Sequence, residues 1–374
     1  MKKNTRNLIP VMAMLMSLAI TSWGVKAQNV TQPRGVSPAA KFEQTIGLTT
    51  VSVEYSRPRV TNNGVDRTGK IWGTLVPYGF EATSFVDGRN IPWRAGANEN
   101  TIITFSDDVK IEGEDLEAGS YGLHVAVYED DRATIIFSDN TSSWGSFYYD
   151  EKEDALRVDV KTVATEPTEV LTYDMVDMGN DFGVLALSWE KKRIPFRISV
   201  DIHEIVLQGF RDELRSIPGF GWQGLQQAAN YCVQNEVNYD EALVWIDRSI
   251  ANTKNFGNLS TKAQLLGKLG KTNESQKMMD EAVEMANVGQ LNFLGYQMLN
   301  QKKYDKAIEY FTLNTKRNPS NANCWDSLGE GYKMAGDKKN AIKNLKKSLS
   351  LNPPANVKAN SVKLLKELGV DVES

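Results

Sequence analysis

Apolar and polar residues alternate along the first half of the chain. Near residue 50, Val51, Val53 and Tyr55 alternate with Ser52 and Glu54. A period of two places successive side chains on opposite faces of a strand, so this stretch predicts a strand with one buried face. Similar runs predict further strands at 101–105, 109–112, 121–128, 134–138, 156–163, 170–178, 184–190 and 194–202.

The segments between these runs are rich in residues that favour tight turns. Examples are Asn62-Asn63-Gly64, Asp87-Gly88 and Gly179-Asn180-Asp181, which supply positive φ angles and local side-chain hydrogen bonds. Short strands separated by such turns, with no helical period between them, are typical of antiparallel sandwiches. We therefore predict an antiparallel β-sandwich or jelly-roll-like domain over residues 28–202.

The hydrophobic period changes at Ile202. From His203 to Arg215 the apolar residues are spaced as in a single amphipathic helix, which Ile217-Pro218-Gly219 would end. We predict that residues 203–221 form a linker helix between the β domain and the rest of the chain.

The remainder of the chain repeats with a period close to 34 residues. In the last unit Trp325, Leu328, Gly329 and Tyr332 precede Ala341, and positions equivalent to that alanine are Ala242, Ser275 and Ala307. This spacing resembles the tetratricopeptide repeat, a helical hairpin that buries its apolar face only by stacking on its neighbours. The resemblance predicts an all-α tetratricopeptide-repeat solenoid of four repeats over residues 222–355, with a capping helix and tail over 356–374.

Tetratricopeptide arrays usually bind a protein or peptide in a groove lined by the first helix of each hairpin. Carried over by position, the resemblance implies a groove lined by Gln227, Tyr231, Gln264, Asn292, Tyr296, Asn323, Asp326, Glu330 and Lys333. In the last repeat we expect Trp325, Leu328 and Tyr332 to be buried, with Asp326, Glu330 and Lys333 facing the groove. The alternative is an array that only packs on the β domain.

Several motifs in the β half resemble one family of exported bacterial proteins. They include Leu75-Val76-Pro77-Tyr78-Gly79, Trp93-Arg94-Ala95-Gly96-Ala97-Asn98-Glu99, Trp144-Gly145 and Trp189-Glu190. Over residues 33–200 the chain is similar to domain-of-unknown-function family 2911 (DUF2911), which implies a fold and no activity. The stretch 80–92 is longer than the resemblance leads us to expect.

The start of the chain has the features of a secretory signal. A basic start at Lys2, Lys3 and Arg6 precedes an apolar run, and Val25-Lys26-Ala27 offers small residues at the cleavage positions. The apolar run is too short to span a bilayer, so we expect a cleaved signal peptide over residues 1–27 and a periplasmic or secreted protein. The alternative is a single membrane anchor.

Charge and cysteine content narrow the classes of partner. Without residues 1–27 the chain has 39 basic and 47 acidic side chains, and residues 28–202 alone carry a net charge of −11. Nucleic-acid binding needs a basic footprint, so no nucleic acid is expected.

Cys232 and Cys324 both lie in the helical half, too far apart for a disulfide. We expect them to be small buried apolar residues.

Aromatic residues in the turn-rich segments of the β half suggest a ligand site. Flat rings beside polar side chains suit a concave pocket. The candidate ligand-binding residues are Tyr78, Trp93, Arg94, Asn98, Glu99, Trp144 and Tyr149. The alternative is that the rings fill the ends of the sandwich.

The candidates for catalysis are fewer. His124 is the only histidine of the β domain, on a predicted strand, where packing is its commoner role. No cysteine accompanies it for a zinc site, and the acidic clusters do not follow a calcium-loop spacing. We expect no metal or cofactor and no assigned catalytic residue. A carboxylate-dependent hydrolase of carbohydrate or cell-envelope polymer remains open, because carboxylate pairs have no fixed spacing in sequence.

The function predicted from sequence is therefore binding and scaffolding outside the cytoplasm. The repeats would engage a protein or peptide and the β domain a second ligand, with a purely structural assembly module as a further alternative.

Overall fold

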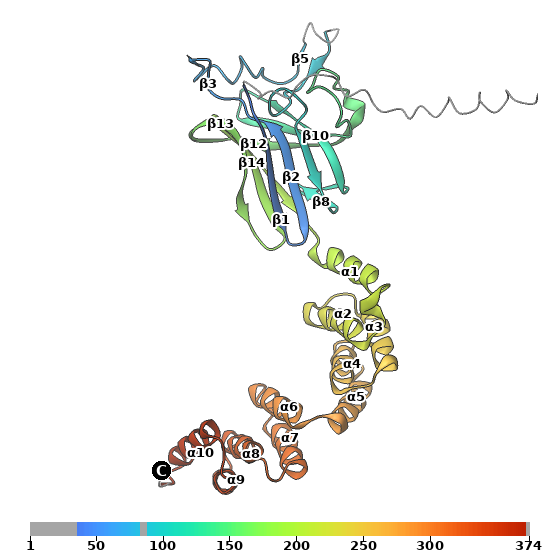
Figure 1. Cartoon of the computed structure of the whole chain (residues 1–374), viewed down its shortest axis with the longest axis vertical. Helices are drawn as coiled ribbons and strands as arrows, with labels where there is room; N and C mark the ends of the chain where they lie inside the picture. Colours follow the sequence, from blue (N-terminus) through green and yellow to red (C-terminus); the bar gives the residue numbers. More distant parts are fainter. Residues whose placement is uncertain (1–35, 83–87, 372–374) are drawn as a thin grey trace, which may run out of the picture. The chain divides into compact units, whose positions relative to one another are not determined.

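The computed structural model describes residues 36–82 and 88–371, and the expected signal segment, residues 1–27, lies outside them. The chain divides into two compact units between Asp201 and Ile202 (Figure 1). The first unit is built of strands and the second of helices.

Two antiparallel sheets form most of the β unit. The larger has the strand order β1-β2-β7-β10-β11-β12 and the smaller the order β13-β14-β8-β9, with two short ribbons, β3-β4 and β5-β6. The first sheet comprises β1 (Ala39–Ile46), β2 (Thr49–Ser56), β7 (Ile102–Phe105), β10 (Gly119–Val127), β11 (Arg132–Ser138) and β12 (Asp154–Lys161). The second comprises β13 (Val163–Met178), β14 (Phe182–Ser199), β8 (Val109–Ile111) and β9 (Glu114–Leu116). The ribbons are β3 (Thr61–Asn62), β4 (Val65–Asp66), β5 (Glu81–Ala82) and β6 (Asn90–Ile91). The antiparallel β architecture predicted from sequence is confirmed.

Aromatic pairs join the two sheets across the core. Phe137 on β11 meets Phe196 on β14 edge to face, with ring centroids 6.0 Å apart. Tyr55 on β2 meets Tyr173 on β13 at 4.7 Å. The Tyr173 hydroxyl donates a hydrogen bond of 2.9 Å to the Ala95 carbonyl. Burial of these large rings supplies the main stabilisation of the core, and both cysteines of the chain lie in the other unit.

Several strands differ from the sequence prediction, including the short β9 and the two ribbons β3-β4 and β5-β6, and the long β1 and β14 differ most clearly. β1 was not predicted, because the polar Gln44 interrupts the apolar alternation of Ala40, Phe42 and Ile46 on its inner face, at the edge of its sheet. β14 runs through two predicted strands and the charged segment between them. Glu190 interrupts its regular geometry, with φ at 52°.

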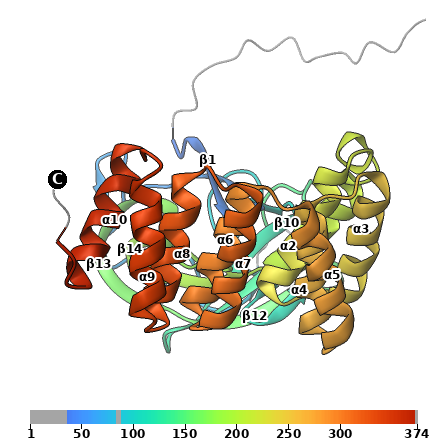
Figure 2. The same ribbon diagram turned by 90° about the horizontal axis from the view of Figure 1, so that it is seen from below.

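The second unit is an array of antiparallel helical pairs. Its helices are α1 (Ile202–Glu213), α2 (Trp222–Asn235), α3 (Tyr239–Asn252), α4 (Phe256–Lys268), α5 (Thr272–Met285), α6 (Val288–Asn300), α7 (Tyr304–Arg317), α8 (Ala322–Met334), α9 (Lys338–Leu349) and α10 (Ala355–Glu367). Figure 2 shows the pairs in chain order. The hairpins α2/α3, α4/α5, α6/α7 and α8/α9 follow the predicted repeats, and α10 follows the last of them. Among the described residues, no helix has both the length and the apolar composition needed to cross a membrane.

Glycine allows the two helices of the last two hairpins to approach closely. A Cβ atom at Gly295 would lie 2.3 Å from the Phe311 ring, and one at Gly329 would lie 2.6 Å from the Leu345 side chain. Both distances are too short for any side chain, so glycine is required where α6 crosses α7 and where α8 crosses α9. This explains why the Leu-Gly pair recurs in the sequence.

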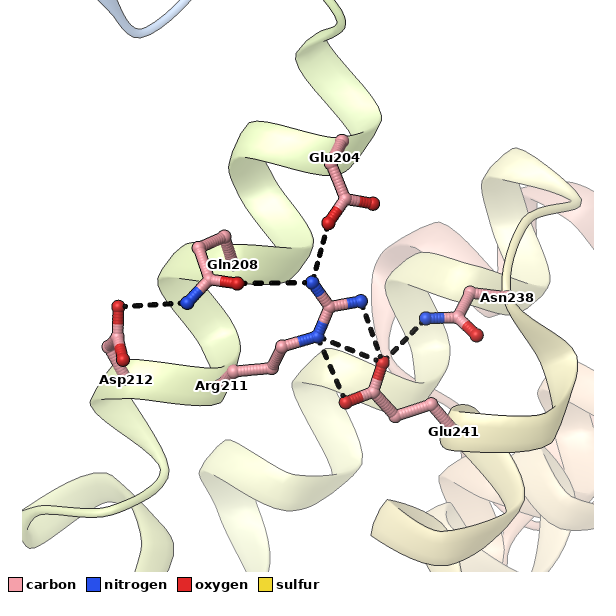
Figure 3. Close-up of polar contacts among 6 residues, drawn as sticks. All are labelled: Glu204, Gln208, Arg211, Asp212, Asn238 and Glu241. Atoms are coloured by element: carbon pink, nitrogen blue, oxygen red, sulfur yellow. Dashed lines mark hydrogen bonds and ion pairs between the residues drawn. The ribbon is translucent and has the colours of Figure 1, made fainter. Parts of the chain in front are cut away.

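Helix α1 packs on the first repeat. Leu207 and Leu214 are buried with residues of α2 and α3, and the Phe210 ring contacts Tyr231 at 5.4 Å and Trp245 at 6.1 Å. Figure 3 shows Arg211 bound to Glu204, Gln208 and Glu241. The segment predicted as a linker helix thus supplies an apolar face that covers the start of the array.

Candidate functional site

A cavity of about 830 Å³ opens among the loops of the β unit. This volume is in the range of small-molecule sites. Its described lining comes from residues 36–38, 58–67, 75–76, 93–98, 144–147 and Trp189 of β14. Residues 93–98 are held against the larger sheet, since the Trp93 backbone exchanges two hydrogen bonds with Val125 of β10, at 3.0 and 2.8 Å.

Three tryptophans pack together beside this cavity. Trp93 stacks on Trp189 with ring centroids 6.0 Å apart and an interplanar angle of 20°. Trp72 meets both rings edge to face, at 5.8 and 6.0 Å. Trp189 is buried, whereas Trp93 remains partly exposed, and its indole N–H donates to the Gly96 carbonyl at 3.1 Å. The cluster fixes the Trp93 ring at the cavity wall.

Arg94 is held in place by contacts with neutral groups. Its guanidinium donates to the Asn98 carbonyl and lies over the Phe147 ring, 4.7 Å from the centroid. Burial lowers the pKa of Arg94, although arginine stays charged at neutral pH. No carboxylate among the described residues pairs with it. A partly buried cation without an anion is costly.

His124 lies on β10 beside this region and is a packing residue, as expected. Its side chain is 2% exposed, its Nδ1 lies 2.9 Å from the Ser146 hydroxyl, and its ring meets Tyr149 edge to face at 5.4 Å. Burial, together with the positive charge of Arg94, lowers the pKa of His124 to about 4. The imidazole is therefore neutral near pH 7.

The structure brings together four of the seven predicted ligand residues. Trp93, Arg94, Asn98 and Trp144 line the same cavity, although they come from two segments about 50 residues apart. Asn98 also links the cavity wall to the segment before β1, since its side-chain amide donates to the Ser37 carbonyl at 3.2 Å.

The other three predicted residues lie elsewhere. Glu99 lines a neighbouring cavity and accepts a hydrogen bond from Ser56 at 3.2 Å. Tyr78 is 41% exposed and forms a bridge with Val127. Neither side chain belongs to the cavity of Trp93.

Tyr149 lies outside the cavity of Trp93 and lines a different cavity, of about 550 Å³, together with Phe80 and Arg157. It is 7% exposed, and its hydroxyl donates to Asp154 at 2.7 Å and accepts from Arg157 at 2.6 Å. Burial is the main reason that the pKa of this hydroxyl is raised. The aromatic and polar composition of its segment is the same as that of Trp144, so sequence alone could not separate the two.

Among the cavity residues that sequence reasoning missed are two arginines and a tryptophan. Arg59 and Arg67 follow β2 and were not singled out, and Trp189 was noted only as part of a family motif. Arg67 donates to the carbonyls of Val60 and Arg59. Arg59 lies 3.5 Å from Glu169, which is outside the lining. The turn-rich sequence between β2 and the motif at Trp93 was the feature that could have pointed to Arg59 and Arg67 as cavity residues.

The acidic residues do not gather at this cavity. Its described lining contains no Asp or Glu, so these residues offer no carboxylate pair of the kind that glycoside hydrolysis requires. Within residues 36–82 and 88–371, no group of three His, Cys, Asp or Glu side chains is placed to hold a metal ion.

The predicted groove of the last repeat is partly used by the array itself. Asp326 is 3% exposed and accepts hydrogen bonds from Asn360, at 2.8 Å, and from Ser361, both on α10. Lys333 pairs with Glu367 of the same helix. The expectation that Asp326 faces an open groove is wrong, because α10 packs where the first helix of a fifth repeat would lie.

Neighbouring repeats are also linked along this face. The Tyr296 hydroxyl donates to Glu330, one repeat later, at 2.9 Å, and burial raises the pKa of Tyr296. In the apolar set of the last repeat Leu328 is buried, as expected, while Trp325 and Tyr332 are only half-buried. Asn323 is half-buried and Gln264 exposed.

The first repeat is shifted by one residue relative to the prediction. Helix α3 begins 17 residues after α2 begins, whereas α9 begins 16 residues after α8 begins. Tyr231 consequently faces α1, where its hydroxyl lies 2.9 Å from Nδ1 of His203. Gln226 therefore replaces the predicted Gln227 at the position that Asn292 occupies in the third repeat.

Gln226 and Asn292 share one unusual property. The side-chain carbonyl oxygen of each is buried and has no hydrogen-bond partner within the described part of the chain. A buried amide oxygen without a donor costs roughly 1–3 kcal/mol. The insertion in the turn after α2, at Glu236 to Asn238, was the signal that could have identified Gln226.

Comparison with known families supports the assignment of the β unit. Residues 37–198 match the family described as "Protein of unknown function (DUF2911)". The resemblance noted in the sequence is thus confirmed, and the match covers this unit without extending into the helices. No curated protein matches the chain.

Solved structures match the helical unit. They include YrrB, "a TPR protein with an unusual peptide-binding site", at 20% identity over 43% of this chain and 83% of that chain, with a TM-score of 0.28. A tetratricopeptide-repeat protein from Cytophaga hutchinsonii matches at 13% identity over 44% and 75%, with a TM-score of 0.30. MamA from Desulfovibrio magneticus matches at 17% identity over 40% and 90%, with a TM-score of 0.26. The assignment to tetratricopeptide repeats rests on the repeat period and the glycine contacts described above.

Proposed function

We propose that this chain is an exported two-site binding protein. The cavity of the β unit binds a small ligand, and the first helices of the array bind a protein or peptide segment. The chain would thereby connect a ligand to a protein partner outside the cytoplasm.

One observation carries this proposal: Trp93, Arg94, Asn98 and Trp144 line a single cavity of about 830 Å³. Ligand sites combine apolar rings with a few fixed polar groups. Trp144 is 52% exposed, so its ring is available to a ligand and is not needed to complete the core. The absence of acidic side chains from the described lining favours binding over carboxylate-dependent hydrolysis there.

The array is proposed as a protein-binding surface because two equivalent amides are unsatisfied. Gln226 in the first repeat and Asn292 in the third each have a buried carbonyl oxygen without a donor among the described residues. Rotation of each side chain toward the groove would expose its oxygen to a backbone N–H donor of an extended peptide. This would remove the cost of leaving both oxygens unpaired.

The array proposal is tested by comparing two double variants of the full chain. Gln226→Ala with Asn292→Ala should lose a protein partner that the wild type co-purifies, while the melting temperature stays close to that of the wild type. The matched control is Asn273→Ala with Gln276→Ala, the same residue types exposed on α5, and it should retain the partner. Retention of every partner by the first variant would contradict the groove.

The cavity proposal is tested with Trp144→Ala. A library of neutral and acidic saccharides, nucleotides and amino acids is screened against the wild type by thermal shift. Any ligand found should bind the variant more weakly, without a change in the melting temperature of the free protein. A ligand that binds both proteins equally lies outside this cavity.

Export is tested separately. Mass spectrometry of the native protein should find an N-terminus at or near Gln28, outside the cytoplasm. A full-length chain in the cytoplasm would contradict this part of the proposal and leave the two binding sites unaffected.

A further inference from the structure

The charge of the cavity is opposite to that of the domain around it. Residues 28–202 carry a net charge of −11, yet the described lining contains Arg59, Arg67 and Arg94 and no acidic side chain. Arginines lining a concave site in an otherwise acidic surface produce a local positive potential. Such a potential favours an anionic ligand.

Two of these arginines have no carboxylate partner among the described residues. Arg94 binds the Asn98 carbonyl and the Phe147 ring, and Arg67 binds only backbone carbonyls. Each guanidinium has five N–H donors, so donors remain for a ligand. A carboxylate is the planar anion that matches this fork geometry.

The remainder of the lining is suited to a ligand with rings and hydroxyl groups. Trp93 and Trp144 present partly or largely exposed indole rings. Neutral side chains with both donors and acceptors complete the wall: Ser37, Thr61, Asn62, Asn63 and Asn98. Amides and hydroxyls of this kind pair with sugar hydroxyls, while the indole rings cover the apolar faces of sugar rings.

We infer that the cavity binds an acidic saccharide, with its carboxylate on Arg94 and its rings against Trp93 and Trp144. This inference rests on the proposed ligand site and names its ligand class. Arg94 is held by Phe147 and Asn98 before a ligand arrives, so little side-chain ordering is left to oppose binding.

The test uses calorimetric titration of the full chain from Gln28 to Ser374 with three probes. Trigalacturonate supplies both rings and carboxylates, its methyl ester supplies the rings without the charges, and inorganic phosphate supplies charge without rings. We expect only trigalacturonate to bind, with an affinity that falls as salt is added.

The variants separate the charge from the ring. Arg94→Gln should weaken trigalacturonate binding by roughly 10- to 100-fold, as expected for a charge-assisted hydrogen bond. Trp144→Ala should weaken it as well. The matched control is Arg132→Gln, since Arg132 is an exposed arginine paired with Asp130 on another surface, and it should bind as the wild type does. If Arg94→Gln melts early, Arg67→Gln replaces it in the same titration.

Each remaining outcome identifies what has failed. Equal binding of the methyl ester, sensitive to Trp144→Ala, would overturn the anionic ligand but support the proposed ligand site. Binding of phosphate alone would show an anion site without saccharide recognition and would overturn the inference. Failure of trigalacturonate to bind the wild type would also overturn it, while the library screen still decides whether the cavity binds any ligand.

Discussion

The guanidinium of Arg94 occupies the space that a side chain at Gly145 would need. A Cβ atom at Gly145 would lie 2.3 Å from Cζ of Arg94, and Gly145 has a φ of 59°. The two residues are about 50 positions apart in the chain, in segments that both line the cavity. The Trp144-Gly145 motif therefore has a physical cause, because only glycine leaves room for Arg94.

This contact predicts the effect of Gly145→Ala. The substitution would force Arg94 from its place over Phe147 and put alanine at a positive φ, which costs roughly 1–2 kcal/mol. We expect a lower melting temperature for the β unit and weaker binding of any cavity ligand. Gly113→Ala is the control, because Gly113 also has a positive φ but meets no atom within 4 Å and lies outside the cavity lining. Equal ligand binding by both variants would contradict the role given to this contact.

The buried imidazole of His124 predicts a loss of stability in mild acid. Its pKa is lowered from 6.5 to about 4 by burial and by Arg94, so between these values the unfolded chain binds a proton that the folded chain does not. Stability is then complete above the unfolded pKa and falls as the pH decreases towards 4, by about 3 kcal/mol in all.

The measurement is chemical unfolding of the wild type and of His124→Gln at about pH 7 and about pH 4.5. Carboxylates titrate in both proteins, so the difference between the two proteins in lost unfolding free energy reports on the imidazole alone. The variant should lose less stability between the two values. An equal loss would show that His124 is protonated without penalty.

Asp326 illustrates the limit of carrying positions over from a repeat pattern. The pattern predicted the repeats and the position of the first helices. It could not show that α10 would cover the last groove, because Asn360 and Ser361 lie outside the repeat consensus and form a contact 34 and 35 residues away. Similarly, one extra residue in the turn after α2 moved the groove position from Gln227 to Gln226.

In the β unit, the predictable part was the set of strands with one buried face. Alternation identifies such strands locally, whereas the cavity depends on which loops the sheets bring together. Trp93 and Trp144 were singled out because rings in turns are conspicuous. Arg67 was not, since the turn-rich sequence around it does not single out one residue, and only the fold places it in the same cavity as Arg94.

Replacement of Asp326 should therefore destabilise the array. Asp326→Ala removes the acceptor of the Asn360 amide and leaves the Ser361 hydroxyl only Ser348 Oγ, at 3.2 Å, among the described residues, at a cost of roughly 1–3 kcal/mol. Asp280→Ala is the control, because Asp280 is exposed on α5, and its effect should be within about 0.5 kcal/mol. Chemical denaturation measures the free energy of unfolding of each variant. Equal values would mean that the contact with α10 contributes nothing.

The last prediction concerns α1 and the extent of the array. Leu207 is 4% exposed and Leu214 is 7% exposed, and both pack on the first repeat. Leu207→Ala should cost roughly 2–5 kcal/mol, as for other buried leucines. Ile217 is 83% exposed, so Ile217→Ala is the matched control, with an expected effect within about 0.5 kcal/mol.

Truncation tests the same contact at the level of the helix. Residues 202–374 should melt cooperatively with a helical circular dichroism spectrum. Residues 220–374 lack α1 and expose the rings of Tyr231 and Trp245, which Phe210 contacts in the full chain. We expect this fragment to be helical but to melt at a lower temperature, with its first repeat unfolding before the others, because each repeat is stabilised only by its neighbours. Identical melting of the two fragments would show that α1 is a linker after all, and that the array begins at Trp222.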